Sequence, residues 1–152
     1  MSNEKKHNIL IVDDEEIIRK ICSLTLKKAG YEVQAVENGV KALNLLQKYD
    51  CDIVLLDLKM PLMGGLELLH TLRRDFPHIQ VIIMTAYATI ENAINAMKEG
   101  AYDFILKPFK ADQLRVIVER CAKSIDLSNE IQELKLANKK LKEIQEMKDK
   151  FI

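Results

Sequence analysis

The chain of 152 residues has no tryptophan, three prolines, five glycines and three cysteines. Cys22, Cys51 and Cys121 are odd in number, stand in apolar contexts and lack metal-ligand spacing, which favours buried, reduced thiols over a disulfide framework. The 23 basic and 23 acidic residues balance, so no net field attracts nucleic acid or an anionic membrane. No apolar run approaches the ~20 residues of a membrane span, and no signal-peptide pattern opens the chain. These absences predict a cytoplasmic protein with no membrane part in this segment.

Five short apolar runs recur in the first two thirds of the chain, and each predicts a strand. The segments between them have helical spacing, for example Ile17, Ile21 and Leu24 in the first. Five βα repeats require crossover connections, hence a parallel sheet with helices on both faces. The predicted strands are residues 9–12, 33–36, 53–56, 81–84 and 104–106. The second and fifth are short or diluted by polar residues, which fits the edges of a doubly wound, flavodoxin-like sheet of order 2-1-3-4-5.

A last helix is predicted to begin near Ala111 and shows no clear stop, and glycine and proline are absent from Leu127 onward. Residues with the four-three spacing of a coiled-coil seam follow within 126–152: Leu127, Ile131, Leu134, Asn138 and Leu141. The spacing changes after Leu141. We expect two parts, a compact domain over residues 1–125 and a helical linker over 126–152 that forms a parallel homodimer.

Polar side chains gather where the predicted strands end. Asp13 and Asp14 follow the first strand, Asp57 the third, Thr85 the fourth and Lys107 the fifth. Because ligands of open parallel sheets bind beyond the carboxyl ends of the strands, these side chains are expected in one crevice. Three neighbouring carboxylates raise one another's pKa unless a cation intervenes, and Mg²⁺ is a hard ion that suits them. The pattern predicts phosphoryl transfer onto Asp57 as an acyl phosphate, supported by Lys107 and Thr85.

The stretches "ILIVDDE", "VLLDLKMPLMGG" and "VIIMTAYATIENAINAMKEGAYDFILKPF" together resemble the receiver domain of bacterial two-component response regulators. The likeness covers residues 7 to about 125 and is nearest to the NtrC-like group of these CheY-like domains. It implies that a histidine kinase or a histidine phosphotransfer protein supplies the phosphoryl group. It also implies that the domain is a phosphoacceptor with at most autophosphatase activity.

The resemblance assigns roles residue by residue. Asp13, Asp14, Asp57 and the backbone carbonyl of Lys59 are implied to hold Mg²⁺, with Asp57 as the phosphorylated residue. Thr85 and Lys107 are implied to contact the phosphoryl group, with a cis peptide bond before Pro108. The aromatic switch position is Phe104 instead of tyrosine, so switching would use burial of the ring. Lys59 and Tyr87 flank the site, where bulky side chains could shield the acyl phosphate from water.

Two rival functions make different demands on the sequence. A haloacid dehalogenase-like phosphohydrolase also forms an aspartyl phosphate, but it carries a second Asp two positions after the nucleophile, where this chain has Lys59. A flavodoxin-like nucleotide or flavin binder needs a phosphate loop rich in glycine or hydroxyl groups after the first strand. The chain has the acidic "VDDEEI" there. Both alternatives are therefore weaker than a phosphoacceptor.

The final residues bear on the output. "LANKKLKEIQEMKDKFI" resembles the segment that leads into the phosphotransfer helix of sensor histidine kinases. We therefore expect an amino-terminal receiver of a hybrid histidine kinase, with an NtrC-like transcriptional regulator as the alternative. The lysines of this segment alternate with acidic residues, which is typical of a solvated helix and predicts no direct contact with nucleic acid.

Overall fold

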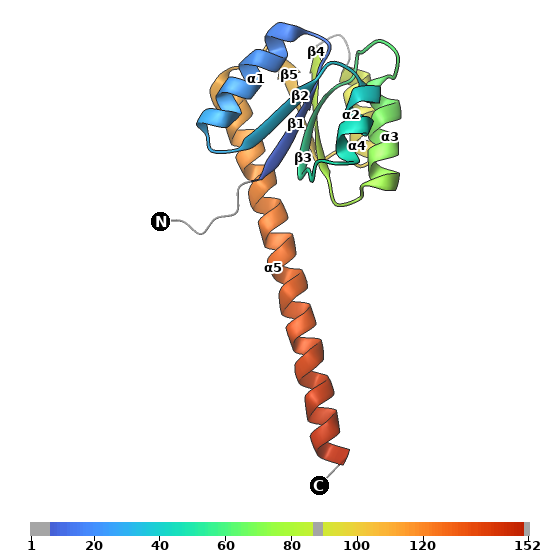
Figure 1. The fold of residues 1–152 in the computed structure, drawn as a ribbon, viewed down its shortest axis with the longest axis vertical. Coiled ribbons are helices and arrows are strands. Elements are labelled where there is room, and N and C mark those ends of the chain that lie inside the picture. Colours follow the sequence, from blue (N-terminus) through green and yellow to red (C-terminus); the bar gives the residue numbers. More distant parts are fainter. Residues whose placement is uncertain (1–6, 87–89, 151–152) are drawn as a thin grey trace. The chain divides into compact units, whose positions relative to one another are not determined.

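The computed structural model describes residues 7–86 and 90–150, and the chain divides into two compact units between Cys121 and Ala122. In the first unit, five parallel strands form one sheet in the order β2-β1-β3-β4-β5 (Figure 1). The strands are β1 (Asn8–Val12), β2 (Glu32–Val36), β3 (Ile53–Asp57), β4 (Gln80–Ala86) and β5 (Asp103–Lys107). The helices are α1 (Glu16–Lys28), α2 (Gly39–Leu46), α3 (Gly65–Asp75), α4 (Ile90–Lys98) and α5 (Ala111–Lys150). The predicted flavodoxin-like fold, strand order and edge strands are confirmed.

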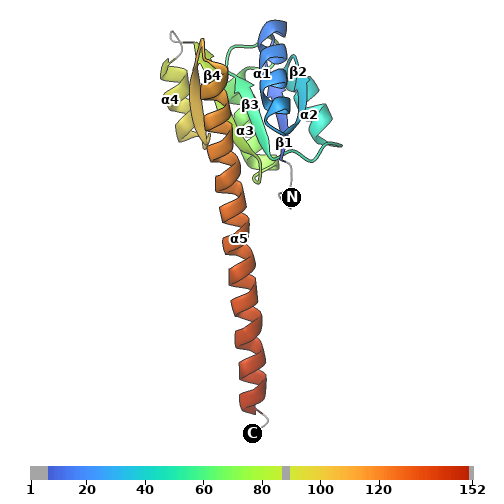
Figure 2. The same ribbon diagram turned by 90° about the vertical axis from the view of Figure 1, so that its left-hand side faces the viewer.

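Helices cover both faces of the sheet, which explains why its central strands are apolar without interruption. Leu10 and Leu56 belong to a cluster with Leu68, Leu69 and other side chains of α2 and α3. The intervening strand residues are also fully buried, and they face the other way because side chains alternate along a strand. Figures 1 and 2 show α2, α3 and α4 on one face, and α1 with the first turns of α5 on the other.

The strands extend beyond the apolar runs that predicted them, because flanking polar residues also join the ladder. β3 includes Asp57, β4 includes Thr85, and β5 ends at Lys107. These three candidate residues therefore sit on strands and not on the loops that follow. Their backbones are held by the hydrogen bonds of the sheet, which fixes the origin of each side chain.

The first predicted helix is present as α1, but its apolar stripe faces solvent. Ile17, Ile21 and Leu24 are 61%, 44% and 62% exposed. The opposite face of α1, which carries Cys22 and Leu26, is buried. All three cysteines of the chain are buried and free, as expected.

The second unit consists of the helical residues of α5 after Cys121. The seam side chains Leu127, Ile131, Leu134 and Leu141 are 44–64% exposed. Pairing of this seam with a second chain, and a boundary after residue 125, stay predictions. None of the helices in the described part of the chain is both long and apolar enough to cross a membrane.

Candidate phosphoacceptor site

The three predicted acids meet at the carboxyl edge of the sheet. Val12 and Leu56 are register partners on β1 and β3, so the residues that follow them, Asp13 and Asp57, come side by side. Together with Asp14, each offers a carboxylate oxygen, and these oxygens lie within 4.8 Å of one another. Asp13 is fully buried, Asp57 is 5% exposed and Asp14 is open to solvent.

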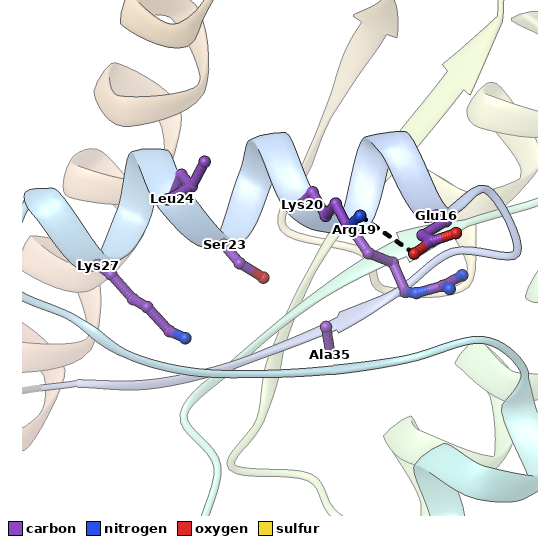
Figure 3. A pocket seen from close by; sticks show the side chains of 7 residues that line it. All are labelled: Glu16, Arg19, Lys20, Ser23, Leu24, Lys27 and Ala35. Carbon is purple, nitrogen blue, oxygen red and sulfur yellow. Dashed lines mark ion pairs between the residues drawn. The ribbon is translucent and has the colours of Figure 1, made fainter.

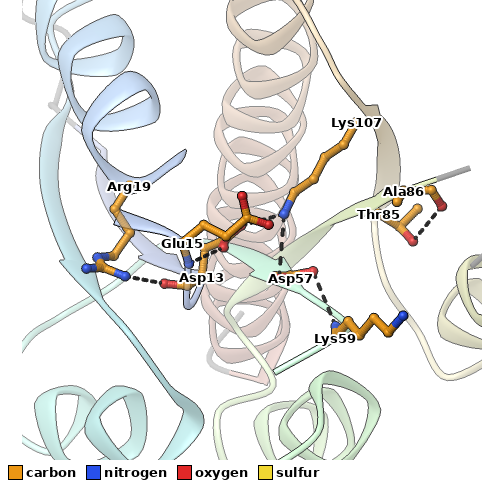
Figure 4. A network of polar contacts seen from close by, with 8 residues as sticks. All are labelled: Asp13, Glu15, Arg19, Asp57, Lys59, Thr85, Ala86 and Lys107. Atoms are coloured by element: carbon orange, nitrogen blue, oxygen red, sulfur yellow. Dashed lines mark hydrogen bonds and ion pairs between the residues drawn. The ribbon is translucent and has the colours of Figure 1, made fainter. Parts of the chain in front are cut away.

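Lys107 reaches this cluster from β5, across the intervening strand β4. Its Nζ lies 2.7 Å from Oδ2 of Asp13 and 3.5 Å from Oδ2 of Asp57 (Figure 4). The Lys107–Pro108 peptide bond is cis, as the resemblance implies. Lys107 thus contacts two of the three acids, and it is nearer to Asp13 than to Asp57.

Three hydrogen bonds hold Asp13, two through its backbone and one through its carboxylate. Its N–H donates to the Val36 carbonyl at 3.2 Å, and its Oδ1 accepts from the Glu15 N–H at 2.9 Å. Arg19 Nη1 donates to the Asp13 carbonyl at 2.8 Å. The contribution of Arg19 was not foreseen, because nothing in the spacing of residues 13 and 19 identifies such a contact. These bonds fix the position from which the Asp13 carboxylate faces Lys107.

The ionisation of Asp57 is perturbed by its surroundings. Burial, followed by the charge of Asp13, raises the pKa of Asp57 to about 6, against the opposing effects of Lys107 and the Lys59 N–H. The sequence predicted such a rise from repulsion between the acids, and burial proves to be the larger cause. Keeping Asp57 ionised in the folded protein therefore costs free energy, and a further cation beside its carboxylate would reduce that cost.

The ammonium of Lys107 is stabilised by the same cluster. Burial acts to lower its pKa, but the hydrogen bond to Asp13 and the charges of Asp13 and Asp57 outweigh it, so the pKa of Lys107 is raised. Lys107 therefore carries a permanent positive charge between the two buried acids.

The remaining predicted residues surround the acids. The Lys59 N–H donates to Oδ1 of Asp57 at 3.2 Å. Thr85 lies one residue beyond Met84, the register partner of Asp57, and its hydroxyl donates to the Ala86 carbonyl at 3.3 Å, to one side of the acids in Figure 4. Phe104 is half-buried and packs against the core. Tyr87 lies outside the described residues.

Gly65 allows a close approach of the backbone behind Asp57. A Cβ at this position would lie 2.4 Å from Cα of Leu58 and 2.6 Å from the Asp57 carbonyl oxygen. The Gly65 N–H donates to the Leu58 carbonyl at 3.1 Å, which returns the chain to the end of β3. The sequence shows the glycine pair at residues 64 and 65 but does not predict this contact.

A separate groove of about 470 Å³ lies beside α1 (Figure 3). Residues of α1 from Glu16 to Lys27 line it together with Ala35 of β2. Its cationic side chains are Arg19, Lys20 and Lys27, and Lys20 pairs with Glu16 at 3.2 Å. Arg19 is therefore shared between this groove and the Asp13 carbonyl.

The acid cluster fits a magnesium ion. It offers hard oxygen donors from three carboxylates, and the charge of Lys107 balances only one of them. Mg²⁺ binds through one or two carboxylates and keeps open positions for water or phosphoryl oxygens. The buried Asp13, the exposed Asp14 and the nearly buried Asp57 suit such an ion.

The sequence is similar to those of known proteins. The family model described as "Response regulator receiver domain" matches residues 9–119. The chain is 39% identical over 128 residues to the regulatory protein AtoC of Escherichia coli, covering 84% of this chain and 28% of AtoC. It is 35% identical over 116 residues to the DNA-binding transcriptional regulator NtrC of Proteus hauseri, covering 76% of this chain and 24% of NtrC. The chain thus spans about a quarter of the length of these curated relatives.

A solved structure matches the fold. The crystal structure of the receiver domain of NtrX from Brucella abortus superposes with a TM-score of 0.74 at 35% identity. The match covers 76% of this chain and 98% of that receiver domain.

Proposed function

Because the chain belongs to the response regulator receiver family, we propose that it accepts a phosphoryl group from a phosphohistidine onto Asp57 in the presence of Mg²⁺. The observation that carries this proposal is the cluster itself. A nearly buried acid ends a central strand, with two further acids and one lysine within reach of its carboxylate.

The transfer is a displacement at phosphorus. A lone pair of an Asp57 carboxylate oxygen forms the new O–P bond, and the P–N bond of the phosphohistidine breaks with its electron pair passing to the imidazole nitrogen. Lys107 would pair with the phosphoryl oxygens, because its Nζ already lies 3.5 Å from Oδ2 of Asp57. Thr85, on the neighbouring strand, would donate its hydroxyl to another phosphoryl oxygen.

Mg²⁺ would be held by Asp13, Asp14, Asp57 and the Lys59 carbonyl. When bound, the ion neutralises negative charge on the transferring group. Asp13 would be held in place for this role by its hydrogen bonds to Val36, Glu15 and Arg19.

The donor would be a protein, either a histidine kinase or a histidine phosphotransfer protein. The exposed apolar stripe Ile17, Ile21 and Leu24 supports this, because it begins three residues after the acid pair. Apolar side chains gathered on a surface mark sites of protein contact. A donor that covers α1 would bring its histidine to the neighbouring acids.

Intact-mass analysis tests the phosphoacceptor proposal. With acetyl phosphate and Mg²⁺, we expect the wild type to gain the mass of one phosphoryl group and the variant Asp57→Asn to gain none. Asp50→Asn is the matched control, since Asp50 is an exposed acid just before β3 at the opposite edge of the sheet. A mass gain that survives EDTA, or that persists in Asp57→Asn, would contradict the proposal.

Phosphorylation would be sensed through Thr85 and Phe104. Movement of the Thr85 hydroxyl toward the phosphoryl group would open space for the Phe104 ring, which is half-buried on the adjoining strand β5. Such a shift would bias the neighbouring helix α4 between two arrangements.

For the whole protein, we propose a transcriptional regulator of the NtrC type, whose output lies in another part of the molecule. The relatives named above support this reading over a hybrid histidine kinase. The kinase remains the second candidate because of the segment "LANKKLKEIQEMKDKFI". A phosphotransfer histidine coded directly after Ile152 would favour the kinase, and an ATPase domain would favour the regulator. In both cases residues 126–152 would dimerise and make no direct contact with nucleic acid.

A further inference from the structure

The loop between β3 and α3 contains a strained turn with a leucine at its apex. The Met63 N–H donates to the Pro61 carbonyl at 2.9 Å, and Leu62 between them has φ of 71°. A hydrogen bond between residues two apart, around a residue with positive φ, is the rarer and more strained form of γ-turn. Leucine is disfavoured in this conformation, which glycine adopts without a steric penalty.

The Leu62 side chain gains nothing from the fold that would offset this strain. It is 83% exposed, the highest value among the large exposed apolar side chains in the described part of the chain. Its neighbours Met63 and Gly65 hold the loop instead. Met63 packs over the start of α2, where a Cβ on Gly39 would lie 2.9 Å from the Met63 sulfur. Gly65 closes the other end of the loop against Leu58 and Asp57.

A residue that is strained and exposed at a defined place is better explained by function than by stability. The position of Leu62 identifies the relevant contact. Leu62 is five residues after Asp57, in the loop that leaves the phosphoacceptor strand. A protein that delivers a phosphoryl group to Asp57 must approach across this edge of the sheet, whereas a small-molecule donor has no surface to cover the leucine.

We propose that Leu62 is an anchor residue for the phosphodonor protein, inserted into an apolar pocket beside the donor's phosphohistidine. This inference rests on the proposed function of Asp57. Because the contacts of Met63 and Gly65 hold the loop at both ends, little conformational freedom would be lost on docking. Leu62 then sets the rate of transfer from a protein donor and leaves the chemistry at Asp57 unchanged.

The test compares two phosphoryl donors on the same variants. The protein donor is the autophosphorylated kinase that transfers fastest to the wild type in a screen of the source organism's purified histidine kinases. The small donor is acetyl phosphate with Mg²⁺. The variants are Leu62→Asn, which tolerates positive φ but is polar, and Leu62→Met, which keeps an apolar side chain. Leu136→Asn is the matched control, because Leu136 is an exposed leucine (54%) in the second unit.

We expect Leu62→Asn to lower kcat/KM for the kinase at least about tenfold, as the loss of a buried anchor does. Labelling by acetyl phosphate should stay within about twofold of the wild type, and Leu62→Met should retain most of the kinase transfer. Leu136→Asn should change neither reaction. The thermal midpoint of Leu62→Asn should not fall, since asparagine relieves strain at this position.

Four results would overturn the proposal that Leu62 is an anchor residue. Unchanged kinase transfer in Leu62→Asn would show that the donor does not use Leu62. An equal loss with both donors would place the effect in the Asp57 chemistry. A change of sedimentation coefficient caused by Leu62→Asn would assign the leucine to contact between copies of this chain. If acetyl phosphate labels the wild type but none of the kinases transfers a phosphoryl group to it, a protein donor is excluded. Failure of acetyl phosphate to label Asp57 would instead refute the proposed function, on which the anchor rests.

Discussion

Replacing Asp57 by asparagine should stabilise the metal-free protein near neutral pH. Burial and the charge of Asp13 raise the pKa of Asp57 from 3.8 to about 6 in the folded state. Between these pH values the unfolded chain releases a proton that the folded chain retains, so stability falls as pH rises through this window. Above about pH 6 the full cost of holding ionised Asp57 is present, and below about pH 4 it disappears.

The size of this effect follows from the shift. A rise of about two pH units corresponds to about 3 kcal/mol at 1.36 kcal/mol per unit. Water on the exposed Asp14 side screens part of the repulsion, so we expect Asp57→Asn to gain about 1–3 kcal/mol. The substitution preserves an acceptor for the Lys59 N–H, and Lys107 keeps its closer partner Asp13 at 2.7 Å.

Urea unfolding in EDTA at about pH 8 and about pH 4 measures this difference. The variant should unfold at higher urea than the wild type near pH 8, and the two curves should converge near pH 4. The control Asp50→Asn removes an exposed carboxylate outside the cluster, so its unfolding curve should stay close to that of the wild type near pH 8. A destabilised Asp57→Asn near pH 8, or a difference that is the same at both pH values, would refute the reasoning. Added Mg²⁺ should stabilise the wild type more than the variant, because the ion binds the folded acids.

Two further predictions concern the loop and the helix. Gly65→Ala should lose about 1–3 kcal/mol in urea unfolding, because its Cβ would overlap the backbone of Leu58, whereas Gly64→Ala, which meets nothing within 4 Å, should lose less than about 1 kcal/mol. Equal losses would contradict this account. In sedimentation of the full chain, we expect a dimer that Ile131→Glu, on the seam, dissociates and Leu136→Glu, off the seam, leaves intact. A wild-type monomer at high concentration would exclude the coiled coil.

The fold and the members of the candidate site followed from local patterns. Unbroken apolar runs such as residues 53–56 can be buried only between two helical layers, and parallel strands bring their carboxyl ends to one edge. That reasoning placed Asp13, Asp57 and Lys107 together without any measured distance. The helices were also predictable from local spacing. The buried face of α1 was not predictable, because Ile17, Ile21 and Leu24 have the spacing of a core stripe and yet are exposed.

The sequence by itself determined the order of the strands, the edge where the polar side chains gather and the residue types that meet there, because side-chain periodicity and chain connectivity are written into it. Only the tertiary structure decided the relations between distant segments. Lys107 lies closer to Asp13 than to Asp57, Arg19 holds the Asp13 carbonyl, and burial exceeds repulsion in raising the Asp57 pKa. It also decided that Leu62 stands exposed in a strained turn. These properties depend on distances and on the water excluded by packing, and neither is encoded in local spacing.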